Sequence, residues 1–380
     1  MSHEPDVVIV GGGLIGTAAA LHLAQMGMST VVVDRDFTSR ASYAAAGMLT
    51  PACEYDEWMP RDFWSLLQEG LLYYPEFLDQ HGMDHDEVGY RASDFTLLAM
   101  RETAAELSDR YSMLKQLGTD CQLWNQDQVS ERESHLSPEA HSGGVRIHDQ
   151  AVVNPRLLLS AMTQRATSQG VTFVRGAVSC LFVGQDGVTV TADGQQIRSA
   201  QLVLAAGPWN SEMAALAGIV LAPLTPVKGQ MIELRGPAHA IDSVVFMPAG
   251  GCGSIVERSP GRYVVGTSEE YVTVDTANTA GVIAAILSRL GRVLPAARNW
   301  EIADMWCGFR PMHADELPSL GRIPGLPVVV AAGHHRNGVL LTPLTGQIVA
   351  QTVADKAERN LSLYRPDRPQ RRHARFASKY

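Results

Sequence analysis

The chain has 380 residues, of which 46% are hydrophobic and 19% are charged. At roughly 100–200 residues per domain, this length favours two domains over one. The composition excludes a disordered chain, a coiled coil and a collagen-like repeat. The formal net charge of −9 argues against nucleic acid as the main partner, because binding to a phosphate backbone needs a basic face.

The cysteines and the two ends of the chain bear on its compartment. The five cysteines include no Cys-x-x-Cys pair and no metal-ligand spacing, so we expect reduced thiols, no metal and a cytoplasmic protein. The acidic start runs directly into a strand pattern, which predicts no signal peptide. No apolar run approaches the ~20 residues that a transmembrane helix needs. The arginine-rich residues 365–380 indicate a solvated tail, with contact to an anionic surface as the alternative.

The N-terminal residues alternate between buried strands and a helix. A β-branched run at 7–10 is followed by glycines, a helical pattern over 18–26 and a second buried strand at 30–34. This order predicts one right-handed βαβ unit. The elements expected next are a small-residue loop at 44–51, helices at 61–80, 102–117 and 155–169, and a strand at 95–100.

The second half of the chain is richer in strands. A strand at 171–174 and a β-meander at 178–183, 188–192 and 195–197 precede a buried strand at 202–205. The pattern from 224 to 309 favours strands around a helix near 276–290, and a last strand at 328–332 leads into a helix over 338–356. The segments that look nucleotide-binding are separated by segments that do not, so we expect two interleaved domains.

A glycine motif lies between the first strand and the first helix. Gly11-Gly12-Gly13-Leu14-Ile15-Gly16 fits G-x-G-x-x-G, and Asp34 ends the following strand. The first glycine allows the tight turn, the second lets backbone approach a pyrophosphate, and the third lets helix and strand pack closely. The helix N-terminus favours phosphate, and Asp34 can accept hydrogen bonds from a ribose hydroxyl. The motif predicts NAD or FAD, and the meander followed by Leu204–Trp209 is unlike a simple NAD domain.

Four blocks of sequence together carry a resemblance to a known family. They are 7–16 with Asp34; 41–49; 226–230; and 308–311 with 333–341. With these blocks, the chain resembles the D-amino-acid-oxidase-type family of FAD enzymes, and within it the glycine oxidase of thiamine biosynthesis and related amine oxidases. The blocks spread over nearly the whole chain, and their order and spacing are more specific than any one of them.

The resemblance implies a fold of the α/β class. A Rossmann-like FAD-binding domain is interleaved with an α+β substrate domain built on a large antiparallel sheet that covers the flavin. On this basis we assign 1–50, 145–220 and 308–380 to the FAD-binding domain, and 51–144 and 221–307 to the substrate-binding domain.

The resemblance also implies an activity. A hydride passes from the substrate carbon that bears nitrogen to FAD, and the imine hydrolyses to an oxo acid and ammonia or an amine. In an oxidase, oxygen then yields hydrogen peroxide. Two alternatives stay open: a dehydrogenase that passes electrons to a quinone or a carrier protein, and a flavoprotein subunit without turnover. The sequence leaves the substrate and a homo-oligomeric state open.

The family match assigns site residues. Arg310 corresponds to the arginine that binds the substrate carboxylate, since a guanidinium matches a carboxylate with two hydrogen bonds. Arg336 is the second residue expected in catalysis. The residues expected to bind FAD are Gly11, Gly13, Leu14, Ile15, Gly16, Asp34, Arg35, Ser42, Ala45, Ala46, Gly47, Met48, Val178, Ala206, Gly207, Trp209, Gly308, Arg310, Gly333, His334, Arg336, Asn337, Gly338, Val339 and Leu340. Those expected to contact substrate are Met48, Ser254, Glu269, Arg310, His335 and Arg336.

The chain departs from the family pattern near the expected substrate. Glycine oxidases carry a tyrosine over the flavin on the strand that here reads 251–257, which has no aromatic residue. Glu269 stands where an apolar residue is usual. We hypothesise a substrate that is larger than glycine and cationic, with Glu269 as the residue that recognises its positive charge. The alternative is that Glu269 and Glu270 are solvated turn residues. Cys307 is expected to be a free thiol and not a covalent flavin tether.

Overall fold

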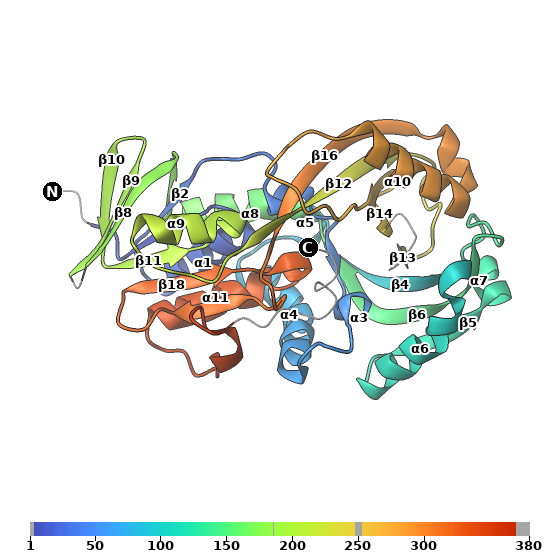
Figure 1. The fold of residues 1–380 in the computed structure, drawn as a ribbon, viewed down its shortest axis with the longest axis horizontal. Coiled ribbons are helices and arrows are strands. Elements are labelled where there is room, and N and C mark those ends of the chain that lie inside the picture. The colour runs from blue at the N-terminus through green and yellow to red at the C-terminus, as the bar shows by residue number, and fades with distance from the viewer. Residues whose placement is uncertain (1–3, 185, 248–252, 370–380) are drawn as a thin grey trace.

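The computed structural model describes residues 4–184, 186–247 and 253–369 (Figure 1). Two parts of the sequence-based expectations lie outside these residues: Cys252 with the start of its strand, and 370–380 of the arginine-rich tail. Within the described residues, no helix is both long enough and apolar enough to span a membrane.

The first sheet has six strands in the order β17-β18-β11-β1-β2-β7. All neighbours are parallel except the edge pair of β17 and β18. The strands are β1 (Val7–Val10), β2 (Thr30–Asp34), β7 (Thr172–Arg175), β11 (Gln201–Leu204), β17 (Ser319–Arg322) and β18 (Val328–Ala332).

Each face of this sheet is covered, which explains why its strands are apolar on both sides. Val7 and Ile9 face a core formed with α1 (Leu14–Gln25), α8 (Pro155–Ser168) and α11 (Thr342–Val353). Val8 and Val10 face the opposite way. They pack with the meander of β8 (Val178–Gly184), β9 (Gly187–Ala192) and β10 (Gln195–Ser199), which stands with α9 (Asn210–Leu216) at one end of the molecule (Figure 1).

Among the residues that the structure describes, the second sheet has nine strands. Its order is β16-β12-β15-β14-β13-β4-β6-β3, with β5 also paired to β6. Every pair is antiparallel except β13 with β4. The strands are β3 (Met48–Leu49), β4 (Arg91–Met100), β5 (Cys121–Asn125), β6 (His141–Val152), β12 (Thr225–Arg235), β13 (Val244–Met247), β14 (Gly253–Ser259), β15 (Arg262–Gly266) and β16 (Glu301–Met312).

Helices lie around this second sheet. The outer end carries α6 (Leu107–Gln116), α7 (Gln126–Arg132) and α10 (Ala280–Val293), while α4 lies below the junction of the two sheets (Figure 1). The remaining helices are α2 (Ala41–Ala44), α3 (Pro51–Glu54), α4 (Arg61–Gln80), α5 (His85–Val88), η1 (Arg101–Glu106), η2 (Gly207–Trp209), η3 (Pro295–Asn299), η4 (His335–Asn337) and η5 (Ser362–Tyr364).

The long strand β16 joins the two halves of the molecule. It pairs with β12 along its length. Near its end, Phe309 forms an isolated bridge with Arg40, and Met312 forms one with His334. Arg310 lies between these two bridges, so the second sheet delivers it to the loops of the first sheet.

The α/β fold with a large second sheet is confirmed, and several elements have the expected bounds. The strands at 7–10, 30–34 and 328–332 and the helix at 61–80 agree fully. The single helix expected at 102–117 is wrong at its start, because residues 101–106 form the 3₁₀ helix η1. The strands β5 and β6 were not expected. The domain boundaries proposed from the sequence stay a prediction.

Candidate functional site

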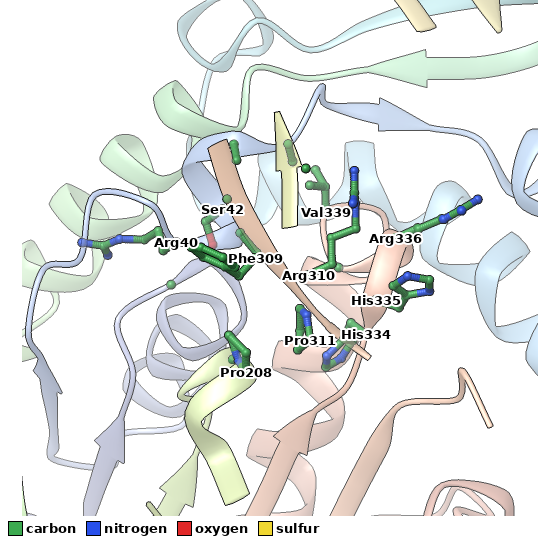
Figure 2. Close-up of a pocket in the computed structure, with 18 of the residues that line it drawn as sticks. Arg40, Ser42, Pro208, Phe309, Arg310, Pro311, His334, His335, Arg336 and Val339 are labelled. Carbon is green, nitrogen blue, oxygen red and sulfur yellow. The ribbon is translucent and has the colours of Figure 1, made fainter. Parts of the chain in front are cut away.

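A cavity of about 700 Å³ runs between the glycine turn of the first sheet and the roof formed by the second. Figure 2 shows Arg310 and Phe309 on one strand in its middle, with His334, His335 and Arg336 on the neighbouring turn. The small-residue loop after α2 and the end of β11 also line the cavity. Elements from widely separated parts of the chain therefore meet at one site.

The glycine turn forms one end of the site. Gly11 has a φ of 110°, and a Cβ there would lie 2.3 Å from the carbonyl oxygen of Ala205. A Cβ on Gly16 would lie 1.9 Å from the oxygen of Gly11, so only glycine lets α1 pack this closely. Gly13 caps α1 without a side-chain hydrogen bond, and Leu14 N donates to Ser42 Oγ at 3.0 Å. The turn thus presents a helix N-terminus to an anion.

The Asp34 carboxylate is fixed at the next corner of the site. It accepts hydrogen bonds from the backbone N–H groups of Gly12 and Asp36, both at 2.6 Å. The Arg40 guanidinium lies 3.5 Å from the same carboxylate and donates to the Gly12 carbonyl at 3.2 Å. This arrangement holds an acceptor beside the glycine turn, as the recognition of a ribose hydroxyl requires.

Aromatic rings flank the same end of the cavity. The rings of Phe37 and Trp209 meet edge to face with centroids 5.1 Å apart. The Arg35 guanidinium carbon lies 4.2 Å from the Trp209 ring centroid and 4.8 Å from that of Phe37. Val178 of β8 lines the cavity nearby. Together these side chains form a stacked wall suited to a flat heterocycle.

Arg310 provides an unpaired cation at the other end. Its Nη2 donates to Thr267 Oγ1 at 2.8 Å, and its Nη1 donates to the Ser268 carbonyl at 3.3 Å. Burial, and then the charge of Arg336, lower the pKa of Arg310 to about 10, so the group stays protonated at neutral pH. Among the described residues, no carboxylate lies within 4.0 Å of it to form an ion pair. The site is therefore prepared for an anionic ligand.

Arg336, in contrast, is already neutralised. It pairs with Glu269, and its Nη1 lies 3.5 Å from Glu54 Oε2. Burial alone lowers the pKa of Arg336, but the carboxylates of Glu54 and Glu269 raise it by more. Burial likewise raises the pKa of Glu269, while Arg336 and a hydrogen bond from Tyr271 bring it down to about 2. Glu269 is thus a paired anion that is still exposed to solvent, and its role as a substrate contact stays a prediction.

Glu270 also has partners. It accepts hydrogen bonds from Gln230 Nε2 at 3.0 Å and from Ser268 Oγ at 2.5 Å. Lys228, which precedes Gly229 in the same strand, turns its Nζ toward the Ala277 carbonyl at 2.6 Å and does not line the cavity. These bonds fix the turn after β15 that carries the two acceptors of Arg310.

The histidine turn closes the site. His334 Nε2 lies 3.1 Å from Thr345 Oγ1, and burial, together with His313, lowers the pKa of His334 to about 3. His335 Nδ1 lies 3.5 Å from Glu316 Oε2, and burial lowers its pKa as well. His335 Nε2 and Asn337 Oδ1 have no hydrogen-bond partner within the described parts of the chain. These two polar atoms are buried without a partner in residues that line the cavity.

The structure brings nearly all the sequence-predicted residues to the cavity. Gly16 and Gly333 do not line it; Gly16 packs on Gly11, and a Cβ on Gly333 would lie 2.1 Å from the His313 ring. Ser254 lines the wall while its hydroxyl donates to the Gly266 carbonyl at 3.1 Å. Whether the residues act as assigned stays a prediction.

Sequence reasoning missed part of the wall. The strand at 253–257 has no aromatic residue, but the neighbouring β13 places Phe246 and Met247 against the cavity. The expectation that the second sheet places no aromatic ring beside the cavity is therefore incomplete. Glu54 was also missed. Phe246 and Met247 give no sequence signal beyond that of a buried strand, and Glu54 reaches Arg336 only through the fold.

The residues present fit FAD. The glycine cradle and the Asp34 carboxylate suit a pyrophosphate and a ribose, and the wall of Phe37, Trp209 and Arg35 suits adenine. Cys307 is free, and its Sγ donates to the Thr276 carbonyl at 3.2 Å. Cys53, Cys121 and Cys180 are free as well.

Comparison with known sequences identifies the class of protein. The profile of the DAO family, described as FAD dependent oxidoreductase, matches residues 6–352. Glycine oxidase of Geobacillus kaustophilus is 32% identical over 364 residues, which is 94% of this chain and 94% of that protein. The bifunctional protein ThiO/ThiG of Synechocystis sp. is 32% identical and matches 94% of this chain but 52% of its own length, so the chain spans about half of that relative.

Solved structures agree with this assignment. Glycine oxidase from Geobacillus kaustophilus has a TM-score of 0.90 at 29% identity and covers 97% of this chain and 100% of its own. Iminodiacetate oxidase from Chelativorans sp. has a TM-score of 0.83 at 26% identity and covers 95% and 98%. The chain belongs to the DAO family of FAD-dependent oxidoreductases. The family resemblance and the FAD cofactor expected from the sequence are therefore confirmed.

Proposed function

We propose that this enzyme oxidises the carbon–nitrogen bond of a small amino acid or secondary amine that carries a carboxylate. The bound FAD supplies the hydride acceptor. The resulting imine takes up water and gives an oxo acid with ammonia or a smaller amine. The names of the relatives, glycine oxidase and iminodiacetate oxidase, support this class of substrate.

One observation carries the proposal: the unpaired guanidinium of Arg310 lies in the cavity that begins at the glycine turn. Its fork can hold a carboxylate with two hydrogen bonds and thereby fix the adjacent carbon–nitrogen bond. The hydroxyl of Thr267 and the carbonyl of Ser268 orient the guanidinium, since they occupy donors on its other side. Arg310 therefore positions the substrate in this account.

Apolar wall residues exclude water from part of the cavity. Phe246, Met247 and Met48 give the cavity an apolar surface beside Arg310. Burial lowers the pKa values of His334 and His335, so both imidazoles are neutral at neutral pH and are weaker bases than an exposed histidine. Hydride transfer from a neutral amine needs no protein base if the amine binds unprotonated.

Oxygen is the proposed electron acceptor, with hydrogen peroxide as product. The acceptor, the cytoplasmic location and the oligomeric state stay predictions. Oxygen uptake by the purified holoenzyme during turnover, with matching peroxide, supports an oxidase. No uptake together with reduction of an artificial dye selects a dehydrogenase that uses a quinone or a carrier protein.

An anaerobic screen of amines tests the proposal directly. Holoenzyme is mixed with glycine, sarcosine, iminodiacetate, and bulky and basic amino acids while the visible absorbance of the flavin is followed. At least one carboxylated amine should bleach it. If none does, the function fails, and a flavoprotein subunit without turnover replaces it. If glycine and sarcosine react far better than bulky or basic amino acids, the hypothesis of an enlarged, cation-selective pocket fails.

A further inference from the structure

Four consecutive carbonyls at the end of α2 and in the loop before β3, those of residues 43–46, accept hydrogen bonds from side chains of other elements. Arg156 Nε of α8 donates to the Tyr43 carbonyl at 3.1 Å, and Trp306 Nε1 of β16 donates to the Ala44 carbonyl at 3.1 Å. Arg258 of β14 donates to the Ala45 carbonyl through Nη2 and to the Ala46 carbonyl through Nε at 3.4 Å. Three side chains from three elements thus hold four consecutive carbonyls.

These three side chains also contact one another. The Arg156 guanidinium carbon lies 4.4 Å from the Trp306 ring centroid, and that of Arg258 lies 5.8 Å from it. The two arginines flank one indole, which is a favourable cation–π arrangement. We call Arg156, Arg258 and Trp306 the loop clamp.

Arg258 keeps its charge without a counter-ion. Among the residues that the structure describes, no carboxylate lies within the 4.0 Å of an ion pair with it. Burial, and then the charge of Arg156, lower the pKa of Arg258 to about 10, so the group is charged at neutral pH at a cost in free energy. Its donors go to two loop carbonyls, so the benefit that offsets this cost must come from the loop.

The clamp has a geometric consequence for the cavity. Ala45, Ala46 and Gly47 line the cavity, whereas the clamp residues do not. A trans peptide directs its N–H opposite to its C=O, so carbonyls held on the outer side turn the next N–H groups inward. The N–H groups of Ala46 and Gly47 have no hydrogen-bond acceptor among the described residues. The backbone N–H groups of Ala46 and Gly47 therefore face the cavity as unsatisfied hydrogen-bond donors.

We propose that Arg258 is a positioning residue for FAD: by holding the carbonyls of Ala45 and Ala46 outward, it aims the N–H groups of Ala46 and Gly47 at the bound cofactor. Trp306 supports this arrangement from the Ala44 carbonyl, because the N–H that follows that carbonyl, on Ala45, already donates to the Ala41 carbonyl at 3.1 Å. These donors favour negative charge, so the clamp strengthens FAD binding and stabilises the reduced flavin. Arg156, which bonds to the start of the loop, has a lesser part. The proposal rests on the FAD site of the family and does not depend on which amine the enzyme oxidises.

Two variants remove hydrogen-bond donors of the loop clamp while they keep most of the side-chain packing. Arg258→Met keeps much of the side-chain volume and removes both hydrogen bonds, and Trp306→Phe keeps a ring and removes one donor. Release of FAD from the diluted holoenzyme is followed by flavin fluorescence, and the reduction potential is measured without any amine. Arg258→Met should weaken FAD binding about 10- to 100-fold and Trp306→Phe about 3- to 10-fold, from the usual strengths of charged and neutral hydrogen bonds. Both should lower the reduction potential.

Controls distinguish this role from a structural one. Arg262 on the neighbouring strand β15 pairs with Glu233 at 3.0 Å and does not touch the loop, so Arg262→Met should leave FAD release and potential unchanged. Arg258→Lys, which reaches fewer carbonyls, should give intermediate values. If Arg258→Met keeps the affinity and potential of the parent, or if Arg262→Met changes both equally, the clamp does not position FAD. Neither readout uses substrate, so a failed amine screen does not affect this test.

Discussion

At the scale of single residues, two arginines in one cavity differ in what their neighbours leave available. Arg336 has Glu54 and Glu269 as partners, whereas Arg310 bonds only to the hydroxyl of Thr267 and the carbonyl of Ser268 among the described residues. A carboxylate that enters the cavity therefore gains more from Arg310, because it need not displace a carboxylate that is already bound. The sequence match assigned both arginines to the site but could not separate their roles, since the difference lies in partners brought by other elements.

Replacing Arg310 by alanine tests its role. We expect carboxylated substrates to bind more weakly by ~2–5 kcal/mol, the usual loss when one half of a desolvated charged pair is removed. Substrate affinity is measured by anaerobic titration of the flavin absorbance on protein that has been saturated with FAD, so that any loss of cofactor does not enter the comparison. An unaltered apparent affinity would remove Arg310 from substrate binding.

Replacing Glu269 by glutamine tests how Arg336 is neutralised. The variant leaves Arg336 with Glu54 alone, so a dicarboxylate amine such as iminodiacetate should bind up to about fivefold better relative to glycine, as expected for an ion pair of ~1 kcal/mol. The ratio of the two affinities in flavin titrations gives the answer. A selective loss of affinity for basic amino acids would contradict this account and restore Glu269 as a reader of cationic substrates.

At the scale of elements, local sequence patterns predict the strands that are buried along their whole length. They fail to predict strands whose formation depends on contacts with distant parts of the chain. The βαβ unit at the N-terminus was predicted because β-branched runs and a glycine turn specify it locally. The strand β6 was not, because its sequence interrupts the apolar pattern with Gly143, Gly144 and Arg146. The structure explains the arginine, which pairs with Asp94, Glu133 and Asp242 from other segments. The loop clamp escaped prediction for the same reason.

The packing of α1 gives a prediction about a whole element. In Gly16→Ala the new methyl group would meet the Gly11 oxygen at 1.9 Å, so the start of α1 must move away from the glycine turn. We expect a stability loss of ~1–3 kcal/mol, as for an overpacked core, together with weaker FAD binding. Urea unfolding and flavin fluorescence measure the two effects.

A matched control lies on another helix. Gly281 of α10 has no atom within 4 Å of the position that a Cβ would take, so Gly281→Ala should be neutral or slightly stabilising. If Gly16→Ala behaves like Gly281→Ala in both assays, the close contact between α1 and the glycine turn does not matter for the cofactor site.

At the scale of the whole molecule, the site exists only because segments from both sheets are interleaved. The glycine turn comes from the first sheet, the roof and Arg310 from the second, and the histidine turn from the region after β18. Such a site couples cofactor binding to global stability, since FAD binds the folded chain and not the unfolded one. Motifs in the sequence identified the glycine turn, Arg310 and the histidine turn. Only the structure shows that these segments face one another across the cavity.

Buried histidines predict how stability depends on pH. Burial is the largest cause that lowers the pKa of His22 to about 3, of His313 to about 4 and of His334 to about 3, from an ordinary value of 6.5. Between these values and 6.5 the unfolded chain binds protons that the folded chain does not, so stability should be full above about pH 6.5 and fall as the solution is acidified. Thermal unfolding between neutral and acidic pH measures the slope.

One histidine allows a direct check of this dependence. His22 packs on the rings of Tyr73, Phe77 and His81, so His22→Leu keeps apolar contacts and removes a titrating group. The variant should lose less stability than the parent on acidification. Stability that stays level or rises as the pH falls below 6.5, or a variant with the same slope as the parent, would contradict the assignment.

The central claim is that FAD lies along the glycine turn and that the substrate carboxylate binds Arg310. A crystal structure of the holoenzyme with a carboxylate that has no amine or hydroxyl group to oxidise, such as acetate, tests it most directly. We expect the pyrophosphate at the N-terminus of α1 and the carboxylate held by the Arg310 guanidinium, with Arg336 still paired to Glu54 and Glu269. A carboxylate bound to Arg336 instead, or an FAD that lies away from the glycine turn, would contradict the account.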